Sequence, residues 1–453
     1  MMMSKKDLTE LEVFELMQTY ENHTFGEIDQ HETPETIKSY HGYVVERSIF
    51  EYEPNSNPFP DLDWLDLEIK STPMRETNRG LSSKERLVLN IINYLEENWL
   101  DFYESSFWKK NKKLLVVFYL YKNTLPKREQ KILKSIIYKY PEKDLKIIMN
   151  DWLTIANKVL SGQAHEISER DTLYLAACTK GVNSDSVRKQ PFSDVLAKQR
   201  AYSLKASYMT TVYNDYVYKN RKDESIVNDA SIQVGKFSLE DYILKKFMPY
   251  FGASVTKLAE LFGIDLISQT KSINSLIVNR ILGLKHDIDH VEEFRKAFII
   301  PKTIRIEPNG KVKESMSFPI FRFMEIIHEE WEDSEINDIM SNGRFMFIVF
   351  KYDLTFREYQ LSNLKFWSMP NIDVLECREV WERTKAIIIN GVEMTPTRKG
   401  INNNLPKKVD NSVMHVRPHG RDASDRLPLP DGRMMTKQSF WLNNDYILKI
   451  ISE

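Results

Sequence analysis

The chain has 453 residues, of which 42% are hydrophobic and 28% charged, with a formal net charge of −2. This length exceeds what one hydrophobic core usually supports, so we expect two domains of about 200 residues each. The composition is typical of a soluble globular protein, and no apolar run of about twenty residues predicts a transmembrane helix. The start, MMMSKKDLTELEV, lacks the apolar region of a signal peptide, so a cytoplasmic location is expected.

The cysteines and the basic residues bear on which kinds of binding site the protein can contain. Cys178 and Cys377 lie in different halves of the chain, so neither a disulfide framework nor a cysteine-based zinc site is predicted. The net charge does not decide whether nucleic acid is bound, because a local positive surface is enough to hold phosphates. Basic residues gather at 109–113, 180–190, 198–200 and 417–426. Any one such run is more often a solvated loop.

The segment PDLDWLDLEIKSTPM at residues 60–74 is the first whose charged side chains suggest a functional site. LDLEIKST alternates with period two, which predicts a half-buried strand with Glu68 and Lys70 pointing the same way. Asp61 follows Pro60 and precedes Glu68 by seven residues, a distance that a turn can fold back. The cluster is therefore a metal site or a surface salt bridge.

The second half of the chain repeats the first. Five pairs of segments follow in the same order: 11–28 with 239–258, 42–50 with 275–283, 109–121 with 341–353, 144–162 with 373–391, and 171–209 with 411–447. They predict helices at the first, second and fourth pairs and fully buried strands at the third. We place domain one at 1–220, a polar linker at 221–235 and domain two at 236–453, each with helices around a mixed sheet in an α/β or α+β arrangement.

The two halves differ at the charged cluster. Alignment places Glu46, Asp61, Glu68 and Lys70 opposite Asn279, Glu293, Ile300 and Lys302, respectively. The second half keeps the lysine but loses two of the three carboxylates. A structural salt bridge would be equally useful in both halves, so the loss indicates that the acids serve chemistry in the first.

The retained residues fit metal-assisted phosphodiester hydrolysis. Asp61 and Glu68 are hard oxygen ligands of the kind that Mg²⁺ prefers. Lys70 can orient the attacking water and offset charge on phosphorus, and Glu46 can hold a second ion or a water. A short acid-x-lysine match alone is weak evidence for a nuclease site. This one, however, lies on an apolar strand, follows a Pro-Asp turn and is lost in the second half.

These residues also carry a family resemblance. GYVVE at 42–46, EPNSNPFPD at 53–61 and LEIKSTPM at 67–74 resemble the catalytic core of the MutH family, which contains the mismatch-repair nicking endonuclease and type II restriction endonucleases that cut at GATC. With the second half included, the chain most resembles the two-domain restriction enzymes. The resemblance implies two tandem restriction-endonuclease-like domains of the PD-(D/E)xK type, the second degenerate.

The resemblance implies roles residue by residue. Asp61 and Glu68 match the metal-binding acids, Lys70 the catalytic lysine and Glu46 the upstream glutamate. A further family lysine precedes the next core strand, where KKNKKLL offers Lys112 or Lys113.

Base reading in the family uses a loop with an Arg-Pro-Lys-type turn. In the first half Thr179, Lys180 and Gly181 stand there; in the second half Arg417 keeps the Arg-Pro and suits a bidentate contact with guanine. Phosphate contact without base reading is the alternative for Lys180 and Arg417. Tyr202 matches an aromatic position beside the DNA, with core packing as its alternative.

The expected function is Mg²⁺-dependent cleavage of double-stranded DNA at a short palindrome, GATC in the related enzymes, leaving a 5′ overhang. The second domain would bind another copy of the site as an effector. The alternatives are a mismatch-repair strand nicker and a non-cleaving DNA-binding regulator. A cognate DNA methyltransferase and a transient dimer on DNA are the other expected partners.

Overall fold

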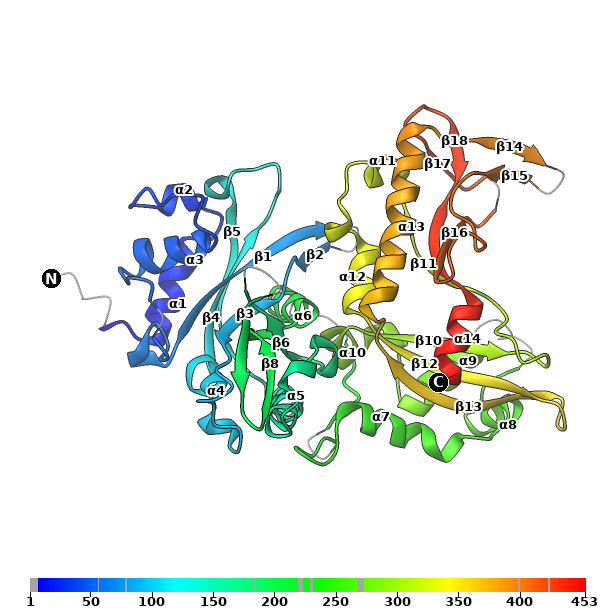
Figure 1. Ribbon diagram of the computed structural model, residues 1–453, viewed down its shortest axis with the longest axis horizontal. Coiled ribbons are helices and arrows are strands. Elements are labelled where there is room, and N and C mark those ends of the chain that lie inside the picture. The colour runs from blue at the N-terminus through cyan, green and yellow to red at the C-terminus, as the bar shows by residue number, and fades with distance from the viewer. Residues whose placement is uncertain are drawn as a thin grey trace. The chain divides into compact units, whose positions relative to one another are not determined.

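The computed structural model describes residues 7–55, 57–77, 80–181, 185–218, 223–228, 231–266, 273–397, 400–422 and 424–453. The chain divides into two compact units, Met1–Tyr242 with Asp289–Phe298, and Ile243–Ile288 with Ile299–Glu453. Each unit combines helices with strands, which confirms the mixed α/β class (Figure 1). Within the described residues, no helix has both the length and the apolar character needed to cross a bilayer.

A four-stranded sheet lies at the centre of the first unit, in the order β2-β1-β4-β5. Its strands are β1 (Glu68–Thr77), β2 (Gly80–Ser83), β4 (Lys113–Leu120) and β5 (Lys131–Lys139). β1 runs parallel to β4, and the other two pairs are antiparallel. The expected half-buried character of β1 is wrong, because the strand is interior to the sheet and both Glu68 and Ile69 are buried.

A second, antiparallel sheet in this unit has the order β3-β9-β6, and a hairpin of two strands lies in the chain between β6 and β9. The strands are β3 (Leu87–Ile91), β6 (Leu175–Thr179) and β9 (Arg200–Leu204), and the hairpin is β7 (Val187–Gln190) and β8 (Ser193–Lys198). Every residue of β9 is buried, so this sheet is covered on both faces.

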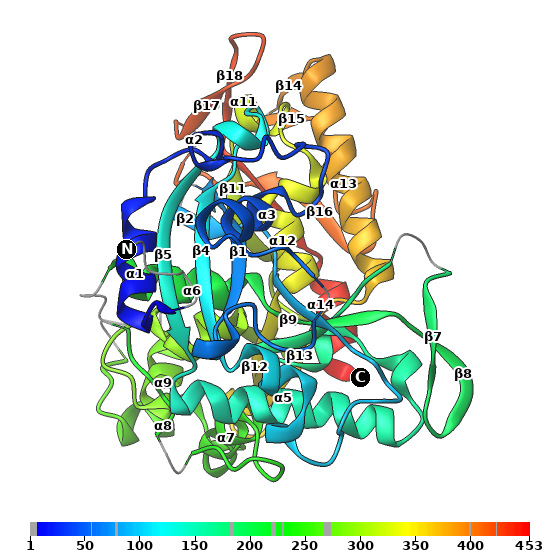
Figure 2. The same ribbon diagram turned by 90° about the vertical axis from the view of Figure 1, so that its left-hand side faces the viewer.

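Helices cover both faces of the four-stranded sheet: α1 and α3 lie on one side and α6 on the other (Figure 2). The helices of the unit are α1 (Glu10–Thr19), α2 (Phe25–Ile28), α3 (Tyr40–Val44), α4 (Ser106–Asn111), α5 (Glu142–Leu160), α6 (Ala206–Val217) and α10 (Glu292–Ala297). A π-helical turn, Val45–Ile49, continues α3. Thr9 and Thr24 begin α1 and α2 with capping boxes, each pairing with a glutamate three residues on.

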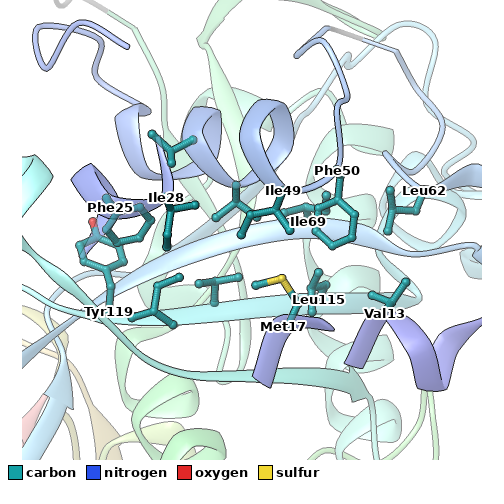
Figure 3. Close-up of a cluster of buried hydrophobic side chains, with 14 of the residues drawn as sticks. Val13, Met17, Phe25, Ile28, Ile49, Phe50, Leu62, Ile69, Leu115 and Tyr119 are labelled. Atoms are coloured by element: carbon teal, nitrogen blue, oxygen red, sulfur yellow. The ribbon is translucent and has the colours of Figure 1, made fainter. Parts of the chain in front are cut away.

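The core of this layer joins the helices to the strands. Val13 and Met17 from α1, Ile49 from the π-helical turn, Ile69 of β1 and Leu115 of β4 belong to one buried cluster (Figure 3). All five side chains are at most 2% exposed. This packing fixes the π-helical turn, which carries Glu46, against the strand that carries Glu68.

The second unit has its own sheets. The main sheet has the order β10-β12-β13, with β10 parallel to β12 and β12 antiparallel to β13. A second sheet has the order β11-β19-β16, and two hairpins pair β14 with β15 and β17 with β18. The strands are β10 (Ile299–Ile306), β11 (Met316–Phe321), β12 (Arg344–Asp353), β13 (Glu358–Trp367), β14 (Met394–Thr397), β15 (Gly400–Asn403), β16 (Met414–Pro418), β17 (Arg426–Pro428), β18 (Met434–Thr436) and β19 (Gln438–Leu442).

The helices of the second unit are α7 (Leu239–Phe247, at the division between the units), α8 (Val255–Leu261), α9 (Ile273–Leu282), α11 (Phe323–Ile326), α12 (Glu335–Asn342), α13 (Asn371–Asn390) and α14 (Asn444–Ser452). Of these, α7, α8, α9 and α13 lie in segments predicted to be helical, whereas α11, α12 and α14 were not predicted. The long helices of both units begin after a proline, and glycines with positive φ follow them: Gly162 after α5 and Gly391 after α13.

The region expected to be a linker, 221–235, belongs to the first unit where it is described. Ile226, Val227 and Ile232 are buried there, and Ile226 N donates to the Glu293 carboxylate at 3.1 Å. Glu293 lies on α10, which a division by sequence order assigns to the second half. The chain thus returns to the first unit before it enters β10.

Candidate active site

A tight loop brings Asp61 back to the start of β1. Leu62 and Leu67 exchange two backbone hydrogen bonds of 3.0 and 3.1 Å, closing the loop around a short 3-10 turn. Asp66 turns the chain with φ of 54°. As a result, Asp61 N donates to Glu68 Oε2 at 3.2 Å, and Asp61 Oδ2 accepts from the backbone N–H of Ile69 at 3.0 Å.

Two lysines converge on the Glu68 carboxylate. Lys70 Nζ lies 2.5 Å from Oε1 and Lys110 Nζ lies 3.5 Å from Oε2. Glu68 is only 1% exposed, and this burial raises the pKa of its carboxyl despite the lysines. Lys110 also donates to the carbonyl oxygens of Asn57 at 2.6 Å and Phe59 at 3.0 Å, so it ties the loop before Asp61 to the same glutamate.

Glu46 approaches from the π-helical turn. A Cβ placed on Gly42 would lie 3.6 Å from both Glu46 Oε1 and Ser71 Oγ, so the carboxylate lies close to β1. Burial and the nearby Asp61 carboxylate raise the pKa of Glu46 to about 8. Single π-helical turns inside helices occur frequently at functional sites.

The acids available to a metal ion form a pair. Among the described residues, no group of three or more His, Cys, Asp and Glu side chains has the spacing of a metal site. Asp61 and Glu68 supply two hard oxygen donors, which suits Mg²⁺, since this ion keeps several waters and needs few protein ligands. Lys70 Nζ lies beside one oxygen of the Glu68 carboxylate and Lys110 Nζ beside the other, so positive charge is stabilised at this position.

The lysine before β4 differs from the expectation. Lys112 pairs with Asp66 at 3.0 Å and Lys113 with Glu10 at 2.8 Å, whereas Lys110 reaches Glu68. The reason is local: Ser105 accepts from Trp108 N at 3.1 Å and begins α4, so Lys110 lies in a helical turn rather than in the strand. The serine cap was the signal in the sequence that could have located it.

Lys113 is also poorly placed for the expected DNA contact. Its side chain is only 16% exposed and pairs with Glu10, which also pairs with Lys139. The interaction fixes α1 to β4 and β5.

Tyr202 lies in the core, so the expected contact with DNA is wrong. Its side chain is 0% exposed, and its ring centroid lies 5.5 Å from that of Phe107. It pairs with Ala177 in the interior of the β6–β9 ladder, where both faces are covered. The core-packing alternative therefore holds.

The candidate reading loop of the first unit is accessible. Thr179, Lys180 and Gly181 are exposed at the end of β6. Lys180 N donates to the carbonyl oxygen of Gln199 at 2.8 Å, which fixes the backbone and leaves the lysine side chain facing solvent.

Arg417 of the second unit is exposed at the end of β16, with its guanidinium 5.1 Å from the ring centroid of Trp441. Stacking of this kind orients the planar N–H fork. In the same unit β10 begins with Ile299 and Ile300, and Lys302 Nζ lies 5.5 Å from the Phe318 ring centroid.

Comparisons with known proteins agree with this geometry. Residues 50–151 match the family model of the DNA mismatch repair enzyme MutH, a segment that contains Asp61, Glu68, Lys70 and Lys110. The chain is 39% identical over 441 residues to the type II restriction enzyme Sau3AI of Staphylococcus aureus, covering 88% of this chain and 89% of that protein. The chain therefore belongs to the MutH-related family of type II restriction enzymes and is a type II site-specific endonuclease.

Proposed function

We propose that the first unit hydrolyses both strands of duplex DNA at a short palindrome, with Mg²⁺ bound by Asp61 and Glu68. The observation that carries this proposal is the convergence of Asp61, Lys70 and Lys110 on Glu68 at the buried start of β1. Mg²⁺ bound there would act as a Lewis acid and lower the pKa of a bound water.

Each side chain then has a role that its contacts support. Asp61 and Glu68 hold the ion. The hydrogen bond from Ile69 N to Asp61 Oδ2 keeps the Asp61 carboxylate at the start of β1, next to Glu68. Lys70, released from Glu68, orients the attacking water and offsets charge on the phosphate. Glu46, whose pKa of about 8 leaves its carboxyl mostly protonated at neutral pH, holds a water.

We also propose that the second unit is a degenerate copy of the first. Support comes from the sheets: β1-β4-β5 and β10-β12-β13 share strand order and directions. Their ladders are interrupted by a bulge at corresponding places, after Phe118 in β4 and after Val349 in β12.

The turn before each first strand supports the same relation. Asp66 and Phe298 have left-handed φ of 54° and 53°, and each stands two residues before the position that is Glu68 in one copy and Ile300 in the other. Since Ile300 cannot bind a metal, the second unit is assigned DNA binding rather than cleavage.

The recognition sequence and the effector role rest on the family resemblance. We propose that the enzyme cuts at GATC and leaves a 5′ overhang, with Thr179, Lys180 and Gly181 contacting the cleaved site. Arg417 of the second unit would contact a second copy of the site, whose occupation stimulates cleavage. A cognate methyltransferase would protect the host DNA, and two chains would meet transiently on DNA, since one active unit cuts one strand at a time.

Paired variants test the site. Glu68→Gln and Lys70→Met should abolish Mg²⁺-dependent cleavage of a duplex oligonucleotide while keeping its affinity, measured with Ca²⁺ in place of Mg²⁺, within about threefold of the unaltered chain. Cleavage that survives in both variants would refute the assignment. Cutting of only one strand by the purified chain would favour the strand-nicking alternative.

A further inference from the structure

The β7–β8 hairpin of the first unit carries an unusual surface. Phe192 at its tip is 76% exposed, and Val195 and Leu196 on β8 are each 51% exposed. Arg188, Lys189 and Lys198 are exposed on the same hairpin. No salt bridge involves these three cations in the part of the chain that the structure describes. One exposed acid, Asp194, follows the tip.

The tip is held rigidly although its aromatic ring is exposed. A Cβ on Gly162 would lie 2.6 Å from the carbonyl oxygen of Phe192, so the end of α5 packs directly under the tip. The buried Gln190 accepts from Ala164 N at 2.7 Å and donates to Val195 O at 2.5 Å.

The backbone at the tip is also strained. Phe192 has φ of 63°, a left-handed conformation that is unfavourable for a residue other than glycine. Strain of this kind, kept at an exposed aromatic side chain, points to a role outside the fold.

The base of the hairpin is bonded to the candidate reading loop. Lys180 N donates to Gln199 O at 2.8 Å, and Gln199 N donates to Ser186 O at 2.9 Å. The loop and the hairpin therefore form one continuous edge. From Val187 to Gln190 the strand rises about 10 Å, which is the length of about three base pairs.

We propose that this hairpin binds duplex DNA flanking the recognition site, with Lys189 and Lys198, which share one face of the hairpin, on the phosphates and Phe192 as an apolar wedge against a base step. This inference rests on the proposed cleavage of duplex DNA and extends it to the flanking sequence. Exposed cations favour a polyanion, and proteins that contact the minor groove insert apolar side chains between base steps in this way.

The corresponding hairpin of the second unit, β17–β18, differs at its tip, although Met434 on β18 is 47% exposed. Arg433 is bonded to Asp431 through both Nε and Nη2, and the tip between the strands carries the buried Leu429 and the acid Asp431. Of these two hairpins, only that of the cleaving unit carries an exposed aromatic ring at its tip.

Affinity should be measured with the full chain, Ca²⁺ and two duplexes, one ending two base pairs outside the site and one with twelve flanking base pairs on each side. On the long duplex we expect Phe192→Ala to weaken binding about tenfold and Lys189→Ala/Lys198→Ala to reduce the slope of log K against log salt by about 1.8. On the short duplex both variants should match the unaltered chain, because the hairpin has no DNA to contact.

Controls separate the hairpin from the fold and from the active site. Leu100→Ala removes an exposed apolar side chain (85% exposed) elsewhere on the unit and should leave the affinity for both duplexes unchanged. Phe192→Trp keeps an aromatic ring at the tip and should bind the long duplex as tightly as the unaltered chain. Glu68→Gln should keep the difference between the duplexes even though it cannot cut. Equal effects of Phe192→Ala on both duplexes, no effect on either, or a change in oligomeric state by sedimentation would overturn the proposal.

Discussion

Lys110 gives the sharpest prediction about the active site. Its ammonium lies 3.5 Å from Glu68 Oε2, and at an effective dielectric constant of about 20 this corresponds to a gross attraction of about 5 kcal/mol. Breaking a buried ion pair from one side costs about 3–5 kcal/mol. In the metal-free chain Lys70 Nζ also lies beside Glu68 Oε1, so we expect the lower end of this range for Lys110→Met, about 3 kcal/mol.

Lys110→Met should lower the free energy of unfolding by this amount. Because it also removes one of the two groups that hold the Glu68 carboxylate in place, we expect cleavage at saturating DNA to slow by about tenfold or more, a loss of about 1.4 kcal/mol of transition-state stabilisation. The assay is single-turnover cleavage of a labelled duplex over a range of Mg²⁺ concentrations. Lys110→Arg should keep most of the rate, because the charge remains.

Lys112→Met is the matched control. Lys112 is two residues away but pairs with the exposed Asp66, and such surface pairs contribute less than about 1 kcal/mol. Its variant should cleave within about threefold of the unaltered chain. A near-normal rate for Lys110→Met, or a larger loss for Lys112→Met, would refute the assignment of Lys110.

Three further predictions follow from other residues. Tyr202→Ala should lower the free energy of unfolding by about 3–5 kcal/mol in urea titrations, whereas Tyr202→Phe should leave DNA affinity unchanged; a selective loss of affinity would return Tyr202 to the DNA surface. Burial lowers the pKa of His41 to about 4, so the unfolded chain binds more protons at this residue between pH 4 and 6.5; the stability of the unaltered chain relative to His41→Phe should therefore fall by about 2 kcal/mol from pH 7 to pH 5, and an unchanged difference would refute the burial of a neutral His41. Arg417→Ala should remove stimulation of cleavage by a second duplex carrying the site, without changing the single-turnover rate on a saturating substrate; unchanged stimulation would exclude Arg417 from effector binding.

Local patterns made the strands and helices predictable. The apolar run before Tyr121 and the one before Asp353 became β4 and β12, because continuous apolar strands are stable only where both faces are covered. The placement of Asp61 was also accessible, since Pro60 and the short spacing to Glu68 leave room only for a tight turn.

Other features depended on packing that no local pattern encodes. In the sequence, the residue pattern around Tyr202 does not differ from that of an exposed strand. Tyr202 is a core residue because every residue of β9 is buried. The return of α10 to the first unit depends on buried charges far apart in sequence, with Lys296 Nζ 2.7 Å from Asp144 Oδ2. Lys110 could not be chosen among five basic or polar neighbours without the helix that begins after Ser105.

The most direct measurement of the central claim is digestion of unmethylated plasmid DNA by the purified chain, with and without Mg²⁺, followed by sequencing of the fragment ends. We predict discrete, Mg²⁺-dependent fragments with 5′ overhangs at GATC, and none with Glu68→Gln. Fragments from Glu68→Gln, or cleavage that does not require a divalent metal ion, would contradict the account.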